Sequence, residues 1–210
     1  MKQINNIFFD LGSVLLDIEV SRTLKSFEKL GISANLLEEI YDEPDNFFFQ
    51  FERGVLSAAD FRNAFRTITE SHMTDRQIDD AWSAMVVGFK NEIIDLLKCL
   101  KLNYTLFLLS NTNEIHVPVY TEMFRETSDG ITFEDLFSKI YYSHKVKLSK
   151  PNPAIYTYVL EDSGVEPEET IFIDDLLQNV NSANKAGLPA YQLKEDEQLI
   201  DLLKRVNITC

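Results

Sequence analysis

Residues 7–17 read Ile-Phe-Phe-Asp-Leu-Gly-Ser-Val-Leu-Leu-Asp, and this stretch decides the fold. Three apolar residues, 7–9, lead directly into Asp10, with Gly12 and Ser13 behind it. A short apolar run followed by turn residues predicts a buried strand, and a strand covered on both faces need not alternate. Open α/β sheets place ligands at the carboxyl ends of their strands. Asp10 is therefore either a functional carboxylate or a residue that closes a turn.

The composition is that of a globular protein with an acidic surface. The chain has 210 residues, of which 45% are hydrophobic and 26% charged, which suits one domain or a domain with a small insertion. The net charge of −14 disfavours nucleic acid as a partner. A phosphate site would need local positive charge from a lysine, a metal ion or helix N-termini. We expect no membrane association, since no apolar run approaches the ~20 residues of a membrane span.

The two cysteines, Cys99 and Cys210, lie far apart in the sequence. They form neither a disulfide framework nor a metal-binding spacing. Residues 1–3 lack the basic and apolar regions of a signal peptide. We therefore expect a reduced, cytoplasmic protein, and a monomer as the default.

The order of the predicted elements indicates an α/β protein. Residues 18–88 predict helices and no strand, with Val20, Leu24 and Phe27 on one apolar helical face. Ser57 with Asp60 and Thr74 with Gln77 predict two helix N-termini in this segment. Strands at 104–109, 140–142, 170–173 and 189–193 then alternate with helices at 91–101, 153–163, 176–186 and 196–205, and the helix at 176–186 is expected to bury Leu176. Such alternation predicts a Rossmann-like parallel sheet with right-handed crossovers. The expected domains are an α/β core of residues 1–17 and 89–210 and an inserted helical domain of residues 18–88.

Polar side chains follow three of the predicted strands: Asp10, Ser110 and the pair Asp174-Asp175. Lys150 opens a helix close to them in the predicted fold. Carboxylates gathered at one sheet edge repel one another without a cation, and oxygen ligands suit Mg²⁺. A hydroxyl, a backbone amide and an ammonium are what a phosphoryl group needs. Asp10 would then be free to attack phosphorus as a nucleophile.

With these motifs the chain resembles the haloacid dehalogenase-like (HAD) superfamily of hydrolases. The motifs occur in the order of that family: Phe9-Asp10-Leu11-Gly12-Ser13-Val14, Leu109-Ser110-Asn111-Thr112, Lys150-Pro151, and Ile173-Asp174-Asp175 followed by Asn179. The helical insertion matches its small cap domain. Within the superfamily the chain is most similar to the glucose-1-phosphate phosphatase-like branch, through Asp10-Leu11-Gly12, Glu52-Arg53-Gly54 and Ser110-Asn111-Thr112-Asn113.

The resemblance implies a Mg²⁺-dependent phosphatase that acts on a small phosphorylated metabolite, such as a sugar phosphate, through an aspartyl-phosphate. The implied metal ligands are Asp10, the backbone carbonyl of Gly12 and Asp175, with Asp174 in support. The implied phosphoryl-binding groups are Ser110, the Asn111 amide and Lys150, and Asp10 is also the implied nucleophile. Asn179 would orient Lys150 or the acidic pair, and Glu52 and Arg53 would face the substrate from the cap.

The chain departs from the family at Gly12, where most of its phosphatases carry a second aspartate. That group protonates the leaving oxygen, and such help is typically worth ~10²–10⁴ in rate. Three explanations stay open: a good leaving group, a proton from Ser13, Asp17 or Glu52, or binding without turnover. A metal-independent dehalogenase also lacks the second aspartate, but adjacent acids at residues 174–175 favour a cation site.

The aromatic residues of the insertion allow two interpretations. Phe47, Phe48, Phe49 and Phe51 are the core of a small helical domain or the lining of a pocket, and the core interpretation is favoured. Trp82 is expected in the same core. Asn113 and His116 follow the second motif, so they lie at the pocket mouth or on the surface.

Overall fold

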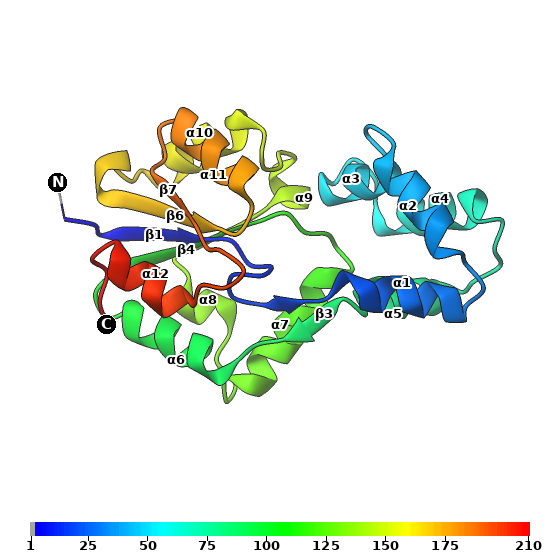
Figure 1. Ribbon diagram of the computed structural model, residues 1–210, viewed down its shortest axis with the longest axis horizontal. Helices are drawn as coiled ribbons and strands as arrows, with labels where there is room; N and C mark the ends of the chain where they lie inside the picture. Colours follow the sequence, from blue (N-terminus) through cyan, green and yellow to red (C-terminus); the bar gives the residue numbers. More distant parts are fainter. Residues whose placement is uncertain (1–2) are drawn as a thin grey trace.

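The computed structural model describes residues 3–210. Its centre is a parallel sheet with helices on both faces and a separate group of helices to one side (Figure 1). The strands lie in the order β5-β4-β1-β6-β7 and comprise β1 (Asn6–Phe9), β4 (Thr105–Ser110), β5 (Lys139–Tyr142), β6 (Thr170–Asp174) and β7 (Ala190–Gln192). β1 is the middle strand and pairs in parallel with β4 and β6.

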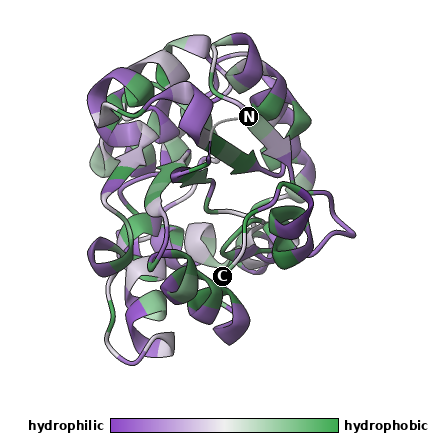
Figure 2. Ribbon diagram, turned by 90° about the vertical axis from the view of Figure 1, so that its left-hand side faces the viewer, coloured by the Kyte–Doolittle hydropathy of each residue, from purple (hydrophilic) through white to green (hydrophobic). Residues whose placement is uncertain are grey.

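The apolar residues of β1 serve both faces of the sheet. Ile7 and Phe9 pack into a cluster on one face, and Phe8 packs into another on the opposite face. The first face is covered by α6 (Asn91–Leu100), α7 (His116–Thr127), α8 (Phe133–Leu136) and α12 (Leu199–Arg205), and the second by α10 (Pro153–Ser163) and α11 (Leu177–Lys185). In Figure 2 hydrophobic stretches lie on the central strands, and the surrounding helices alternate between hydrophilic and hydrophobic residues. The predicted parallel-sheet core is confirmed, since a strand covered on both faces needs no alternation.

Residues 20–83 form what we call the helical group. It contains α1 (Val20–Lys29), α2 (Ala34–Asp42), α3 (Phe47–Glu52), α4 (Ala58–Ile68) and α5 (Asp75–Ser83). Its apolar side chains and Ile115 of the core make a separate cluster, in which Phe61 stacks on Phe51 with ring centres 4.3 Å apart. Phe47, Phe48 and Trp82 belong to the same cluster, so the core interpretation is confirmed for them, and Phe48 also lines the cavity described below. Such ring contacts add to the stabilisation from buried area.

Two helices of this group begin at capping boxes that local sequence predicts. Ser57 and Asp60 cap α4, and Thr74 and Gln77 cap α5, each with reciprocal side-chain to backbone hydrogen bonds. A helix begins at these residues because its first backbone N–H groups have no partner within the helix.

Three sequence-based expectations are wrong. Residues 18–88 were expected to hold no strand, yet β2 (Asp17–Ile18) and β3 (Val86–Gly88) form a small antiparallel sheet where the helical group joins the core. Elements this short carry no readable periodicity. Val20 and Leu176, both expected to be buried, are about half exposed. Val20 begins α1, and Leu176 precedes α11 at the rim of a cavity.

The cysteines also differ from expectation. Cys99 in α6 and Cys210 pair in a disulfide, with 5.4 Å between their Cα atoms. A pairing across 111 residues leaves no spacing from which to predict it. Cysteine usage therefore no longer supports a reducing compartment. Among residues 3–210, no helix has the length and apolar character that crossing a membrane requires.

Candidate active site

The carboxyl ends of β1, β4 and β6 bring three predicted site residues to one edge of the sheet. Asp10 follows β1, Ser110 ends β4 and Asp174 ends β6. Lys150, in the loop before α10, reaches between them: its Nζ lies 2.7 Å from Asp10 Oδ1 and 2.6 Å from Asp174 Oδ2. All four residues are buried. The sheet order explains this convergence, because β1 lies between β4 and β6.

The charges at this edge do not balance. Asp10, Asp174 and Asp175 each place a carboxylate oxygen within 4.8 Å of the others. Burial raises the pKa of Asp10 to about 7, with Lys150 acting against this rise and Asp174 and Asp175 adding to it. Burial and the neighbouring Asp174 likewise raise the pKa of Asp175. Three carboxylates facing one ammonium fit a divalent cation with oxygen ligands.

Three residues donate hydrogen bonds to the Asp174 carboxylate, whereas Asp175 borders the adjoining cavity. Asp174 accepts from Lys150, from both contacts of Asn179 Nδ2 (3.0 and 3.1 Å) and from the Leu176 backbone N–H (2.9 Å). The expected contact of Asn179 with the acidic pair is thus present. Asp175 is only partly buried and lines the adjoining cavity.

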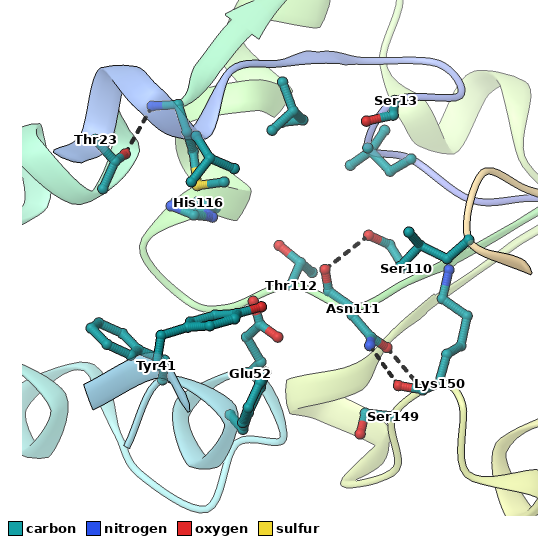
Figure 3. Close-up of a pocket in the computed structure, with 18 of the residues that line it drawn as sticks. Ser13, Thr23, Tyr41, Glu52, Ser110, Asn111, Thr112, His116, Ser149 and Lys150 are labelled. Atoms are coloured by element: carbon teal, nitrogen blue, oxygen red, sulfur yellow. Dashed lines mark hydrogen bonds between the residues drawn. The ribbon is translucent and has the colours of Figure 1, made fainter. Parts of the chain in front are cut away.

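The loop after β4 holds Lys150 in place. The side chain of Asn111 donates to the Lys150 carbonyl (2.8 Å) and accepts from the Lys150 N–H (3.0 Å). Its side chain is therefore committed to the backbone, which leaves the Asn111 main-chain amide as the group that could meet a ligand. The Ser110 hydroxyl lies beside it at the cavity wall (Figure 3).

A cavity of about 930 Å³ separates this edge from the helical group (Figure 3). On the sheet side its lining includes Asp10, Gly12, Ser13, Ser110, Asn111, Lys150 and Asp175. On the helical side it includes Tyr41, Phe48, Phe49, Glu52, Arg53 and Trp82. Every residue that the resemblance implied as a metal ligand or substrate contact, apart from Asp174, therefore borders one space, and Asp174 lies directly behind Lys150. A volume of this size accommodates a small-molecule ligand.

Glu52 and Arg53 both border the cavity, but they differ in their contacts. Burial raises the pKa of Glu52 to about 7. The Arg53 guanidinium forms an ion pair with Asp45. Among the proton donors considered for the Gly12 position, Ser13 and Glu52 line the cavity. Asp17 does not, and its carboxylate pairs with Lys90 at the surface.

Of the two residues expected at the pocket mouth or on the surface, His116 lines the cavity and Asn113 is buried. Asn113 is fully buried, and its side-chain oxygen accepts from the backbone N–H groups of Ile115 and His116. The His116 ring contacts Asn113 and the Trp82 carbonyl, and it lines the cavity. Burial lowers its pKa to about 4, so the ring is neutral at neutral pH.

Sequence reasoning missed Ser143, the first residue of α9 (Ser143–Val146). Its hydroxyl donates to the Glu52 carbonyl (2.6 Å) and accepts from the Thr112 N–H (2.9 Å). The signal was available, because Ser143 directly follows β5 as Asp10 follows β1. Only the fold shows that this hydroxyl joins the helical group to the loop after β4.

The fold is that of a doubly wound α/β enzyme with its polar site at the carboxyl edge of the sheet. A family model for haloacid dehalogenase-like hydrolases matches residues 4–187. The chain belongs to this family, which confirms the resemblance drawn from its motifs.

Its relatives include phosphatases. The chain is 32% identical to a D-ribitol-5-phosphate phosphatase from Bacteroides thetaiotaomicron, over 90% of this chain and 91% of that protein. A HAD family enzyme from the same organism, solved in complex with magnesium and inorganic phosphate, is 36% identical. It has a TM-score of 0.88 and covers 95% of this chain and 98% of its own. A predicted HAD-like hydrolase from Porphyromonas gingivalis matches all of both chains with 32% identity and a TM-score of 0.88.

Proposed function

We propose that this protein is a Mg²⁺-dependent phosphatase that acts on a small phosphorylated metabolite, a sugar or sugar-alcohol phosphate, through a phosphorylated Asp10. The observation that carries the proposal is the meeting of Asp10, Ser110, Lys150 and Asp175 at the edge of one cavity. The sugar-alcohol substrate of the Bacteroides thetaiotaomicron relative supports this choice of substrate class. So does the cavity volume, which suits a small molecule.

In this proposal Asp10 attacks the phosphorus atom, and the bond from phosphorus to the ester oxygen breaks. The ester oxygen leaves as an alcohol after taking a proton from water, since Gly12 supplies no acid at that position. The Ser110 hydroxyl and the Asn111 amide donate hydrogen bonds to oxygens of the transferring phosphoryl group. The positive charge of Lys150 balances the negative charges of that group and of Asp10. Water then attacks the phosphorus of the acyl-phosphate, which releases inorganic phosphate and restores Asp10. Lys150 is well placed for this role, because the carboxylates of Asp10 and Asp174 keep its pKa raised despite burial.

The residues present fit Mg²⁺, since carboxylate oxygens outnumber the one ammonium at the site. Asp10, the Gly12 carbonyl and Asp175 would hold the ion, and Asp174 would support them. When bound, the ion would neutralise the carboxylates and polarise the phosphoryl oxygens. Relatives solved with magnesium support the choice of metal.

In this proposal residues 18–88, which include the helical group, form a cap domain, and residues 1–17 and 89–210 form the core. A cap that covers the sheet edge excludes water from the reaction. Glu52 and Arg53 belong to it and contact the part of the substrate beyond the phosphate. A cytoplasmic location and a monomeric state stay predictions.

The test is phosphate release from p-nitrophenyl phosphate and from a panel of sugar and sugar-alcohol phosphates, with Mg²⁺ or with EDTA. We expect release only with the metal. Asp10→Asn should lose about 10⁴-fold or more of the rate, because the nucleophile is gone. Asp17→Asn is the matched control and should remain active, since Asp17 pairs with Lys90 outside the cavity.

Two results would reject the proposal in favour of another function. Metal-independent chloride release from a haloacid would identify a dehalogenase. Binding of phosphorylated metabolites without any turnover would identify a binding protein. Activity retained by Asp10→Asn would contradict the assignment of the nucleophile.

A further inference from the structure

The chain at Glu52 is held against the core by a fixed set of contacts. Ser143 Oγ donates to the Glu52 carbonyl at 2.6 Å and also contacts the Thr112 backbone. Lys147 Nζ donates to the Gly54 carbonyl. Gly54 has φ +64°, and a Cβ atom there would lie 2.1 Å from the backbone oxygen of His144, so only glycine allows this approach. The end of α3, which carries Glu52, is therefore positioned by the same core segment that contacts the loop after β4.

The Glu52 side chain, in contrast, has no partner in the part of the chain that the structure describes. No hydrogen bond or ion pair of its carboxyl is found among residues 3–210, and it lines the cavity. Figure 3 shows its carboxyl directed into the space between Tyr41 and Asn111. A partly buried carboxyl without a partner is unfavourable unless a ligand supplies one. A carboxyl without a partner, on a backbone that other contacts hold in place, is suited to bind a specific group of a substrate.

Each of the three basic residues that line the cavity already contacts another group of the protein. Lys150 is bound by Asp10 and Asp174. Arg53 is paired with Asp45, and the neutral ring of His116 contacts the Trp82 carbonyl and Asn113.

The helical side of the cavity instead adds negative charge. Two exposed acids of α2, Glu38 and Asp42, stand with Glu52 in its lining. Apart from the three committed residues, no lysine, arginine or histidine among residues 3–210 lines the space. A second anionic group on a substrate would meet carboxylates there and find no unpaired cation.

We propose that Glu52 selects the leaving group of the substrate: its carboxylate accepts a hydrogen bond from a hydroxyl of that group and repels substrates that carry a second anionic group. This inference rests on the phosphatase activity proposed above. Like charges brought together at a binding site disfavour the wrong ligand, whereas a hydroxyl is a donor that a carboxylate accepts well. The enzyme would thus hydrolyse monophosphates whose leaving group is neutral and polyhydroxylated, and would discriminate against phosphorylated carboxylic acids and bisphosphates.

The test compares two substrates of equal length. One is a five-carbon alditol phosphate, and the other is the aldonate phosphate that carries a carboxylate at the far end. At about pH 8 the Glu52 carboxyl is ionised. In the native protein we expect kcat/KM to favour the alditol phosphate by about 10- to 100-fold. This measurement needs no variant, so it holds even if a variant folds poorly.

Glu52→Gln keeps the shape of the side chain and removes its charge. We expect it to lower the alditol-to-aldonate ratio of kcat/KM by about tenfold. Glu39→Gln is the matched control, since Glu39 is exposed on α2 and does not line the cavity. It removes the same charge from the same group of helices, and the ratio should stay at the native value.

Each other outcome overturns the inference in a recognisable way. Equal kcat/KM for both esters, or an unchanged ratio in Glu52→Gln, rejects the selecting role while phosphatase activity stands. A preference for the aldonate phosphate that disappears in Arg53→Gln assigns the cap contact to Arg53 instead. An equal loss on both sugar esters in Glu52→Gln, with p-nitrophenyl phosphate spared, makes Glu52 a proton donor. No phosphate release from any ester rejects the proposed function, and the inference with it.

Discussion

Replacing Lys150 by methionine tests the energetics of the site directly. The Lys150 ammonium is almost fully buried, with 1% of its side chain exposed. It bonds to Asp174, which is completely buried, and to Asp10, which is 12% exposed. Methionine keeps most of the apolar volume of the lysine stem, so the change removes the charge and leaves little cavity. Two buried carboxylates would then face each other without their cation.

The size of the stability loss in Lys150→Met depends on the charges that remain buried after the lysine is removed. Breaking a buried ion pair by removing one partner costs about 3–5 kcal/mol, because the other charge stays buried without compensation. Because Lys150 is buried, we expect Lys150→Met to lose about 3–5 kcal/mol of the free energy of unfolding, more than the ~0–1 kcal/mol of a surface ion pair. Asn179 and the Leu176 N–H still donate to Asp174, which limits the loss on that side.

Urea unfolding in EDTA measures this loss as a change in the free energy of unfolding. Lys139→Met is the matched control, because Lys139 pairs with Asp162 at the surface and should lose at most ~1 kcal/mol. Adding Asp174→Asn to Lys150→Met should recover part of the stability, since one uncompensated charge is removed. A loss below ~1 kcal/mol for Lys150→Met, or no recovery in the double variant, would refute the argument from burial.

Three further changes are expected to have distinct effects. Burial raises the pKa of Glu52 from 4.5 to about 7, so the native state loses stability as pH rises between these values. The free energy of unfolding of Glu52→Gln, measured in urea, should equal that of the native protein near pH 4 and exceed it by ~1–2 kcal/mol near pH 8. This range is smaller than the full pKa shift implies, because Glu52 is partly exposed to solvent. Gly54→Ala should cost ~2 kcal/mol or more and lower kcat/KM, because its Cβ meets the His144 oxygen. Gly130→Ala, where φ is also positive but the space is open, should cost only ~1 kcal/mol. Phe61→Ala should cost ~3–5 kcal/mol in the same assay, since Phe61 is fully buried against Phe51.

Much of the site edge could be predicted from local sequence. The run of residues 7–9 has to be buried on both faces, because continuous apolar strands are stable only in a covered sheet. Parallel strands end at a common edge, so the positions of Asp10, Ser110 and Asp174 behind three such strands already predicted where polar groups would meet. The capping boxes at residues 57–60 and 74–77 were equally readable, because capping depends on residues three apart in the chain.

Other features depend on contacts between distant segments. Ser143 and Glu52 are separated by 91 residues, and their hydrogen bond exists only because α9 packs near the end of α3. The same holds for the pairing of Cys99 with Cys210 and for the short sheet of β2 and β3. No local period or spacing encodes such pairs.

The sequence by itself determined the family, the α/β class and the identity of the charged groups at the sheet edge. It did so because strand burial, strand ends and helix caps are properties of neighbouring residues. Only the tertiary structure decided how those groups are used. It placed β1 between β4 and β6, so that Lys150 meets Asp10 and Asp174 together. It also paired Arg53 with Asp45 and left the Glu52 carboxyl facing the cavity alone. These contacts arise from the packing of segments far apart in the chain. That packing determines which charged groups of the cavity lining are left unpaired for a substrate.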